Sequence, residues 1–364
     1  MPSFFPSPTV SLYMGRMFLV RTFSVLAGLV LVLMTLDLLG ESGKVLAHPG
    51  NGQSELWTYV GLRTPQIIAR FLPFSVLLGT LITLATLNQN SEIISLKSAG
   101  LSAHQILAPL MLTGLLVALI SFAFNERVVA RATATLSAWQ KVEYGPLPDG
   151  SGLLGNVWVR DGDDLIRAGQ VAGRGPAIRL TDVAVYDRVD GRVSAIVSAA
   201  RARYLGAGAW ELAEAQRFDV ASGRARPLGT VRGMNGVTPD QFTLASVNPD
   251  GLSFRELSRA IDDLAAAGRP TQALEAALWH KFSGPLSSVL MPLLGAVAGF
   301  GLARSGRLFV RAVIGMALGF AYFVADNFAL AMGNLGAYPP LLAAWSPFLL
   351  FLLIGETVLV RTEE

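Results

Sequence analysis

The chain has 364 residues, of which 52% are hydrophobic and 15% charged, with a mean hydropathy of +0.48. It is too apolar for an ordinary globular protein, so the sequence predicts an integral membrane protein. The absence of cysteine excludes disulfides, thiolate catalysis and zinc–thiolate sites. The net charge of +3 comes without long basic clusters, which argues against a nucleic-acid-binding protein.

Six apolar segments are long enough to cross a hydrocarbon core of roughly 30 Å, which takes about 20 residues. They are 17–39, 66–87, 106–124, 282–303, 312–332 and 340–359. The first is longer than the core of a signal peptide and lacks a convincing cleavage site, so we expect it to be retained. The predicted fold is a polytopic α-helical membrane protein, with three helices in 1–124 and three in 280–364.

The basic residues predict the orientation. Arg304, Arg307 and Arg311 lie between the fourth and fifth segments, and Arg16 precedes the first, whereas the loop before the sixth is uncharged. An even number of spans places both termini on one side, and the positive-inside rule makes that side the cytoplasm. The block 125–279 is then on the outside face.

Between the second and third spans, the stretch 87–106 is too polar to cross a bilayer. Its first part predicts a short helix that Asn90 or Ser91 caps, with Glu92 in the first turn and Gly100 at the C′ position. Ser102 and Gln105 have capping-box spacing, so a second helix is expected to start there. The result is a helical elbow on the cytoplasmic face.

This elbow is expected to show Ile93, Leu96 and Gly100 along one side and Glu92 at its tip. Such a surface could dock a soluble partner. Glu92 could equally be a surface acid that only satisfies the helix dipole, and its spacing does not separate these readings.

The block 125–279 has the size of a domain and helical ends. Ser253 and Glu256 form a capping box that opens an amphipathic helix. Between the ends, 157–168, 178–197 and 209–220 contain short alternating strands with Asp-Gly turns. Strands of this length and spacing favour a sandwich or jellyroll inserted between the third and fourth spans.

No catalytic motif is found. The histidines are scattered, and H-E-x-x-H, G-x-S-x-G and a Walker A lysine are all absent, so we expect no catalytic residue, no metal site and no cofactor. Any work that the chain performs must draw energy from a partner or an ion gradient.

Charges inside the predicted spans are costly and usually face protein or water. Arg70, Asp37 and Asp326 come from three spans and are expected at similar depth. They could form a polar lining near the outer mouth of a substrate path, or an ion pair that pins helices. In both cases at least one acid is expected near Arg70. Gly315 and Gly319 permit close helix packing, within the chain or at a subunit seam.

The whole chain resembles the LptF/LptG permease family of the lipopolysaccharide export machine, and its LptG branch more than its LptF branch. The resemblance covers nearly the full length and the order of spans. It rests on SLYMGRMFLVRTF, NSEIISLKSAGLSAHQI, VWVRDGDDLIRA, VTPDQFTLASVNPDGLSFRELSRAIDDL, HKFSGPLSSVLMPLLGAVAGF and the segment from Val310 to the last span. It implies a bacterial inner-membrane protein with six spans and a periplasmic β-jellyroll.

The resemblance also implies partners: an LptF-like sister permease, an LptB-like ATPase dimer that uses ATP and Mg²⁺, and LptC-like and LptA-like bridge proteins. Lipopolysaccharide and membrane lipids are the implied ligands. The elbow becomes the coupling helix, with Glu92 facing an arginine-bearing groove of the ATPase. Spans 17–39 and 312–332 become lateral gates. Met34 stands where some relatives carry a basic residue, and Arg70 is a possible substitute.

The jellyroll of this family passes acyl chains, so we expect a hollow, apolar domain lined by inward strand residues. These are Val157, Val159, Val183 and Val185, or the other set if the register is shifted by one. Two alternatives to an LptG-like subunit stay open: an LptF-type subunit, and a sensory membrane protein with a ligand-binding outer domain. An intramembrane enzyme is disfavoured by the missing motifs.

Overall fold

The computed structural model describes residues 6–146, 154–173, 177–189, 192–206, 208–234, 236–244, 248–266, 269–300 and 308–363. The helices, in chain order, are α1 (Pro8–Ala47), α2 (Gln53–Gln89), α3 (Glu92–Ser98), α4 (Ala103–Phe124), the π-helix η1 (Asn125–Val129), α5 (Ala130–Lys141), α6 (Pro239–Leu244), the 3₁₀ turn η3 (Pro249–Gly251), α7 (Phe254–Ala266), α8 (Gln272–Phe300), α9 (Leu308–Asn334) and α10 (Pro340–Glu363).

Within the described residues, five helical stretches are long and apolar enough to cross a membrane: Pro8–Ala47, Gln53–Gln89, Ala103–Lys141, Val313–Asn334 and Pro340–Arg361. The predicted fourth span falls in α8 and continues into 301–303, which lie outside the described residues, as do Arg304 and Arg307. The structure therefore shows a polytopic helical membrane protein, and the count of six stays a prediction.

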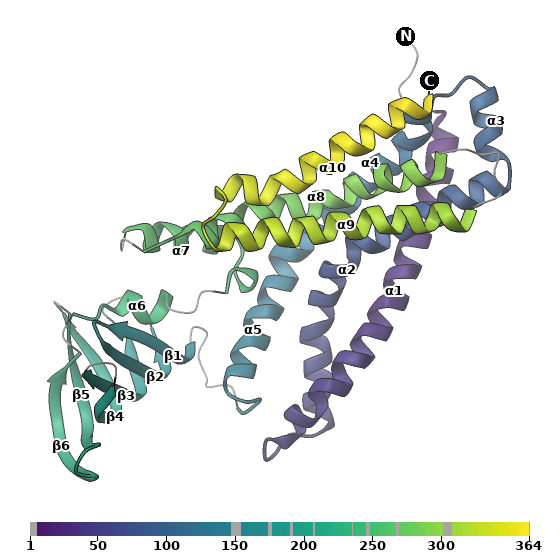
Figure 1. The fold of residues 1–364 in the computed structure, drawn as a ribbon. Helices are drawn as coiled ribbons and strands as arrows, with labels where there is room; N and C mark the ends of the chain where they lie inside the picture. The colour runs from purple at the N-terminus through teal and green to yellow at the C-terminus, as the bar shows by residue number, and fades with distance from the viewer. Residues whose placement is uncertain are drawn as a thin grey trace.

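Several helices run well beyond the predicted spans. α1 has 40 residues and α2 has 37, so at 1.5 Å per residue each is longer than a hydrocarbon core of about 30 Å. α4, η1 and α5 likewise form one uninterrupted helical stretch. The start of α1, the end of α10 and α3 lie at one end of the bundle, and α1, α2 and α5 extend from it toward the β domain at the other (Figure 1). We call these the terminal end and the domain end.

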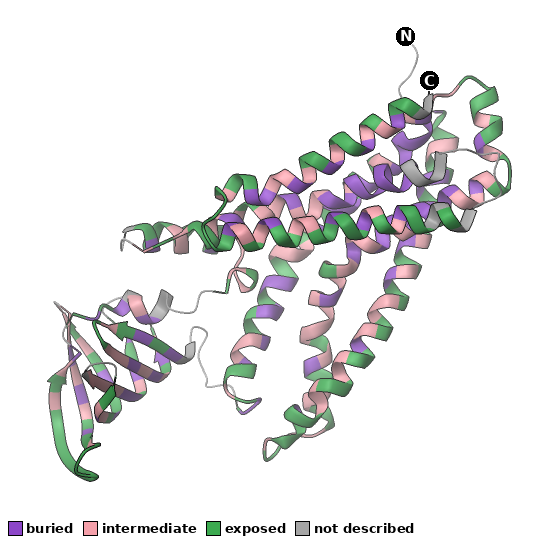
Figure 2. Ribbon diagram, viewed as in Figure 1, coloured by how far each residue is buried: buried purple, intermediate pink, exposed green. Residues whose placement is uncertain are grey.

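The bundle core lies where α1, α2, α4 and α8 meet, toward the terminal end, and buried side chains thin out along the extensions of α1 and α2 (Figure 2). Leu77, Leu84, Leu107 and Leu294 are fully or almost fully buried there. Because lipid tails are as apolar as leucine, close packing rather than hydrophobicity must hold these helices together.

Small residues supply that close packing. Gly319 of α9 lies directly against the Leu77 side chain of α2, and a Cβ on Gly114 of α4 would come within 2.7 Å of the Ser288 carbonyl oxygen of α8. Gly315 is buried on the same helix as Gly319. Packing within the chain therefore explains Gly319, and no subunit seam is needed for it.

The close approach of α2 to the backbone of α1 predicts a mutational effect. A Cβ on Gly79 of α2 would lie 2.9 Å from the Thr22 Cα and 3.0 Å from the Thr22 backbone nitrogen of α1, so Gly79→Ala must push the two helices apart. We expect destabilisation of about 1–3 kcal/mol. Gly61, on the same helix, has nothing within 4 Å, so Gly61→Ala should be neutral or stabilise by up to about 1 kcal/mol. Thermal unfolding in detergent would compare them, and equal effects would contradict the packing argument.

The inserted domain is built on one six-stranded antiparallel sheet. Its strands are β1 (Leu154–Asp161), β2 (Asp164–Ala172), β3 (Arg179–Val189), β4 (Arg192–Gly206), β5 (Ala209–Asp219) and β6 (Arg224–Gly233), in the order β1-β2-β3-β4-β5-β6. Asp161 pairs with Asp164 across a two-residue turn at Gly162, as the Asp-Gly signal predicts.

The strand order corrects the jellyroll prediction. Every described strand pairs with its neighbours in sequence, so the sheet is a sequential meander without the crossover of a Greek key. The sequence also missed β6, which contains Pro227 and Gly229 and is almost entirely exposed. An edge strand tolerates both residues, because one side of its backbone needs no ladder partner.

The inner face of the sheet is filled rather than hollow. Val157, Val159 and Val183 are buried at 1%, 6% and 2% exposure, and Val185 packs at the margin of the same cluster. Trp210 of β5 and Phe242 of α6 fill the space against them, with ring centroids 5.3 Å apart. Of the two registers left open, the structure has the one that turns these valines toward the inner face, where they belong to a packed core and line no open passage in the described part of the domain.

Candidate functional site

The elbow forms at the terminal end through local backbone geometry. Ser91, with a φ of 59°, turns the chain from α2 into α3, and Gly100, with a φ of 85°, ends α3 as predicted. Ser102 and Gln105 make the predicted capping box at α4: the Gln105 backbone N–H donates to Ser102 Oγ at 3.2 Å, and the Ser102 N–H donates to Gln105 Oε1 at 3.0 Å. Capping by the Ser91 side chain is not observed.

The exposed side of the elbow differs from the prediction. Ile93 is 6% exposed and belongs to the bundle core, and Leu96 packs against that core. The apolar side chain that faces outward is Ile94, at 56% exposure. The error arose because a seven-residue helix between two spans must bury one face on the bundle, and the apolar face is the one that packs there.

Glu92 lies at the start of α3 and connects it to α1. Its Oε1 accepts a hydrogen bond from the Tyr13 hydroxyl at 3.3 Å and another from Asn90 Nδ2 at 3.1 Å. A movement of α3 would therefore pull directly on the first turns of α1.

Toward the domain end, Asp37 of α1 is clamped to α2. Its carboxylate accepts from the Tyr59 hydroxyl at 2.6 Å and forms an ion pair with Arg63 at 2.9 Å, with both Arg63 Nε and Nη2 engaged. Arg63 also donates to Gln66 Oε1 at 2.7 Å. Because several bonds meet at one carboxylate, they fix the rotation of α1 about its axis relative to α2 and its position along that axis.

A second contact joins α1 to the turn that follows α5. The Tyr144 hydroxyl donates to Glu41 Oε2 at 2.9 Å, and Asn51 Nδ2 bridges the Val45 and Tyr144 carbonyl oxygens. Burial raises the pKa of Tyr144, and the bond to Glu41 raises it further, so the phenol stays protonated and acts as the donor.

Asp326 also has a partner, on the neighbouring helix. His280 Nε2 of α8 lies 3.0 Å from Asp326 Oδ2 of α9, and the Asp326 side chain is 13% exposed. The second predicted gate helix is thus bound to α8 by a polar contact.

The expected acid near Arg70 is not found. Asp37 pairs with Arg63 and Asp326 with His280, whereas Arg70 is exposed and the described residues offer it no ion pair. Sequence reasoning missed Arg63 because the second span was expected to start at residue 66. Arg63 precedes Arg70 by seven residues, about two helical turns, which is the signal that could have found it.

Both connections to the inserted domain meet at Glu126 of η1. Its Oε2 accepts from the Phe254 backbone N–H at the start of α7, at 2.6 Å, and its Oε1 pairs with Lys281 Nζ of α8 at 3.2 Å. The two side chains are only 18% and 14% exposed, and the Phe254 and Phe282 rings meet edge to face beside them, with centroids 5.2 Å apart. One carboxylate thereby joins the chain entering the domain to the chain leaving it.

The architecture defines a class: a polytopic helical membrane protein with a β domain inserted in the middle of the chain, between two groups of long apolar helices. The sequence profile of the family described as lipopolysaccharide export system permease LptF/LptG matches residues 12–361. The chain belongs to this family.

Two relatives illustrate the similarity. The lipopolysaccharide export system permease protein LptG of Escherichia coli K12 is 26% identical over 314 residues, which cover 83% of this chain and 84% of the relative. The protein of the same name from Haemophilus influenzae is 25% identical over 366 residues, covering 98% of this chain and 99% of the relative.

Proposed function

We propose that the chain is the LptG-type permease subunit of an ATP-driven exporter that extracts lipopolysaccharide from the outer leaflet of the inner membrane. It acts as a non-catalytic subunit beside an LptF-like sister permease and an LptB-like ATPase dimer that uses ATP and Mg²⁺. LptC-like and LptA-like proteins receive the substrate. The full-length family match, together with two LptG relatives, carries the proposal.

The burial of the spans supports a lateral opening at two helices. The most apolar windows of α1 and α9 are the least buried within the chain, at 22% and 28%, compared with 33% for α10, 50% for the helix that contains α4 and 56% for α2. α1 and α9 thus leave most of their surface for lipid or another subunit. They are the two helices that would form the gates.

The contacts indicate a path by which a movement of α3, driven by the ATPase, would reach the domain end of α1. The bond from Tyr13 to Glu92 ties α3 to the start of α1, and the Asp37–Arg63 pair holds the same helix against α2 toward the domain end. A push on α3 would then tilt α1 about its clamp, because a continuous helix transmits displacement along its length. The termini and the elbow would face the cytoplasm, and the β domain the periplasm.

Co-purification from the native host tests the proposal. Affinity-tagged protein should bring down an ATPase and a second permease, identified by mass spectrometry. A sister chain of the LptF branch would assign this chain to LptG, and one of the LptG branch would reverse the assignment. Recovery of a kinase, or of no partner, would favour a sensory membrane protein instead.

A variant at the elbow tests the coupling role. Glu92→Lys should lower ATPase retention by roughly tenfold or more, because losing one charged contact at a protein interface is worth a few kcal/mol. The fold should survive, since even a full ion pair at the surface contributes only about 0–1 kcal/mol, and Glu92 makes hydrogen bonds to Tyr13 and Asn90 there. Retention on the tagged complex and thermal unfolding measure the two effects.

Tyr13→Phe is the matched control. It removes the bond from α1 to Glu92 but leaves the carboxylate in place, so ATPase retention should stay near that of the wild type. Equal loss in both variants would mean that Glu92 only positions α3, and normal retention in Glu92→Lys would remove its docking role.

A further inference from the structure

A straight row of four residues interrupts the sheet. Gly169, Asp182, Ala200 and Glu214 lie opposite one another on β2, β3, β4 and β5. The ladder pairing skips each of them, although the register is the same on both sides: Ala168 pairs with Val183 before the row and Gln170 with Thr181 after it. Four aligned interruptions across four strands indicate a built feature rather than a local irregularity.

The row changes which side chains face outward. Buried positions normally alternate along a strand, but across this row they step by three, from Ala168 to Val171 on β2 and from Ala199 to Ala202 on β4. The same step separates Leu180 from Val183 and Leu212 from Ala215. Two consecutive residues of each strand therefore face away from the core.

Holding this conformation carries strain. Asp182 and Glu214 have φ values of 51° and 57°, a strained region that residues other than glycine rarely adopt. Strain of this kind persists where surrounding contacts fix it, and such sites are often functional.

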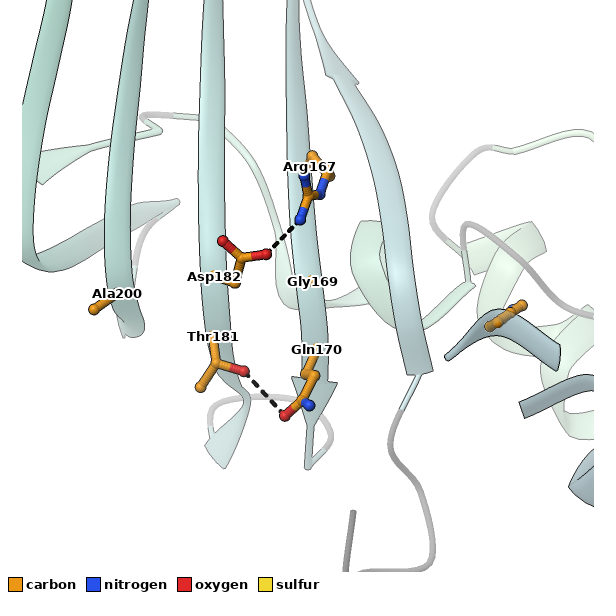
Figure 3. Close-up of a pocket in the computed structure, with 7 residues that line it drawn as sticks. Arg167, Gly169, Gln170, Thr181, Asp182 and Ala200 are labelled. Carbon is orange, nitrogen blue, oxygen red and sulfur yellow. Dashed lines mark hydrogen bonds and ion pairs between the residues drawn. The ribbon is translucent and has the colours of Figure 1, made fainter. Parts of the chain in front are cut away.

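A pocket of about 760 Å³ lies on this outer face, within the size range of small-molecule sites. Its lining consists of Lys141, Arg167, Gly169, Gln170, Thr181, Asp182 and Ala200. Figure 3 shows Arg167 reaching toward Asp182, the Thr181–Gln170 pair beside it, and Ala200 on the next strand. A Cβ on Gly169 would come within 2.7 Å of Asp182 Oδ2, so only glycine fits at that position.

The pocket offers an anion two cationic side chains, Lys141 and Arg167, and its lining contains one acid, Asp182. Arg167 Nη2 contacts Asp182 Oδ2, but Arg167 Nε is buried without a hydrogen-bond partner. A buried N–H that lacks a partner is costly, and a guanidinium presents it in a fork that matches phosphate.

Asp182 acts as a replaceable counter-ion, because its side chain is 73% exposed while that of Arg167 is 33% exposed. Gln170 and Thr181, bonded to each other at 3.3 Å, add an amide and a hydroxyl that suit sugar hydroxyls.

We propose that this outer-face pocket, at the row of interrupted pairing, binds the phosphorylated sugar head group of the exported glycolipid. Arg167 and Lys141 hold the phosphate, and Gln170, Thr181 and Asp182 hold the sugar. The choice of a glycolipid among phosphorylated sugars rests on the proposed function. The head group would then travel on the outer face of the sheet, away from the packed apolar core.

Binding to the full chain in lipid nanodiscs tests this, with three probes: a lipid-free glucosamine disaccharide 1,4′-bisphosphate, the same disaccharide without phosphate, and inorganic phosphate. We expect the bisphosphate to bind best and the unphosphorylated sugar not to bind. Arg167→Gln should lower the affinity for the bisphosphate by about tenfold or more, because it removes a charged hydrogen bond. Lys141→Gln, on α5 and outside the sheet, should weaken it without disturbing the strands.

Arg201→Gln is the matched control: Arg201 lies beside the row on the same face and pairs with Glu214 at 2.8 Å, but does not line the pocket. The affinity of the Arg201→Gln variant for the bisphosphate should match that of the wild type. Equal loss in this variant, no binding to the folded chain, or equal affinity for inorganic phosphate and the bisphosphate would each overturn the proposal. The assay needs no ATPase or sister subunit, so its failure leaves the proposed transport role standing, and absent partners in the co-purification would not affect the binding result.

Discussion

Glu126→Ala is expected to lower the free energy of unfolding by about 3 kcal/mol, the lower end of the range for a buried pair, because removing one partner of this largely buried ion pair leaves the other charge unpaired. Lys281 would lose its counter-ion at 14% exposure, and the Phe254 N–H at the start of α7 would lose its acceptor. Thermal unfolding of the purified protein in detergent measures the first effect. Limited proteolysis between the bundle and the β domain measures the second.

Two comparisons separate this junction from ordinary surface charge. Arg127, the next residue, is exposed, so Arg127→Ala should change stability by no more than about 0.5 kcal/mol. Lys281→Ala combined with Glu126→Ala should cost clearly less than the sum of the single changes, since the two side chains interact directly. An additive double variant would show that the pair contributes no joint stabilisation.

The position of Glu126 gives the junction a role beyond stability. It lies in a π-helical turn, a feature that frequently marks functional positions, and it touches both α7 and α8. Movement of α8 would be passed to the helix that leaves the β domain through this one carboxylate. In a transporter, the contacts of Glu126 would link movements of the membrane helices to the orientation of the β domain.

Arg63→Ala is expected to destabilise the protein by about 2–3 kcal/mol, near the lower end of the range for an unpaired charge in a membrane helix. Asp37 would remain inside the bundle at 20% exposure with only the Tyr59 hydroxyl as a donor. α1 would also be freed from α2 toward the domain end, so under the proposed function ATP-dependent release of lipopolysaccharide by the reconstituted complex should fall.

Arg70→Ala is the matched control on the same helix. Arg70 is exposed and has no ion pair among the described residues, so its removal should leave thermal stability within about 0.5 kcal/mol of the wild type. Asp37→Asn in the Arg63→Ala background should recover much of the lost stability, because it removes the uncompensated charge. Equal destabilisation by the two arginine variants would mean that the Asp37–Arg63 pair is not what holds α1.

The sequence determined the features that depend on local chemistry. Apolar runs of about 20 residues identified most of the long helices, since backbone groups in lipid must be satisfied within a segment. The capping boxes at Ser102 and Ser253 and the turn at Gly162 followed from side chains only a few residues apart. Alternation placed Val157, Val159 and Val183 on the buried face of the sheet.

The tertiary structure alone decided which distant groups meet. Arg63, and not Arg70, reaches Asp37, because helix rotation and height set the pairing and neither is encoded in spacing along one helix. Ile93 turned inward and Ile94 outward because the bundle was already apolar on that side. The row from Gly169 to Glu214 exists only when four strands lie in one register, so no single strand could have revealed it.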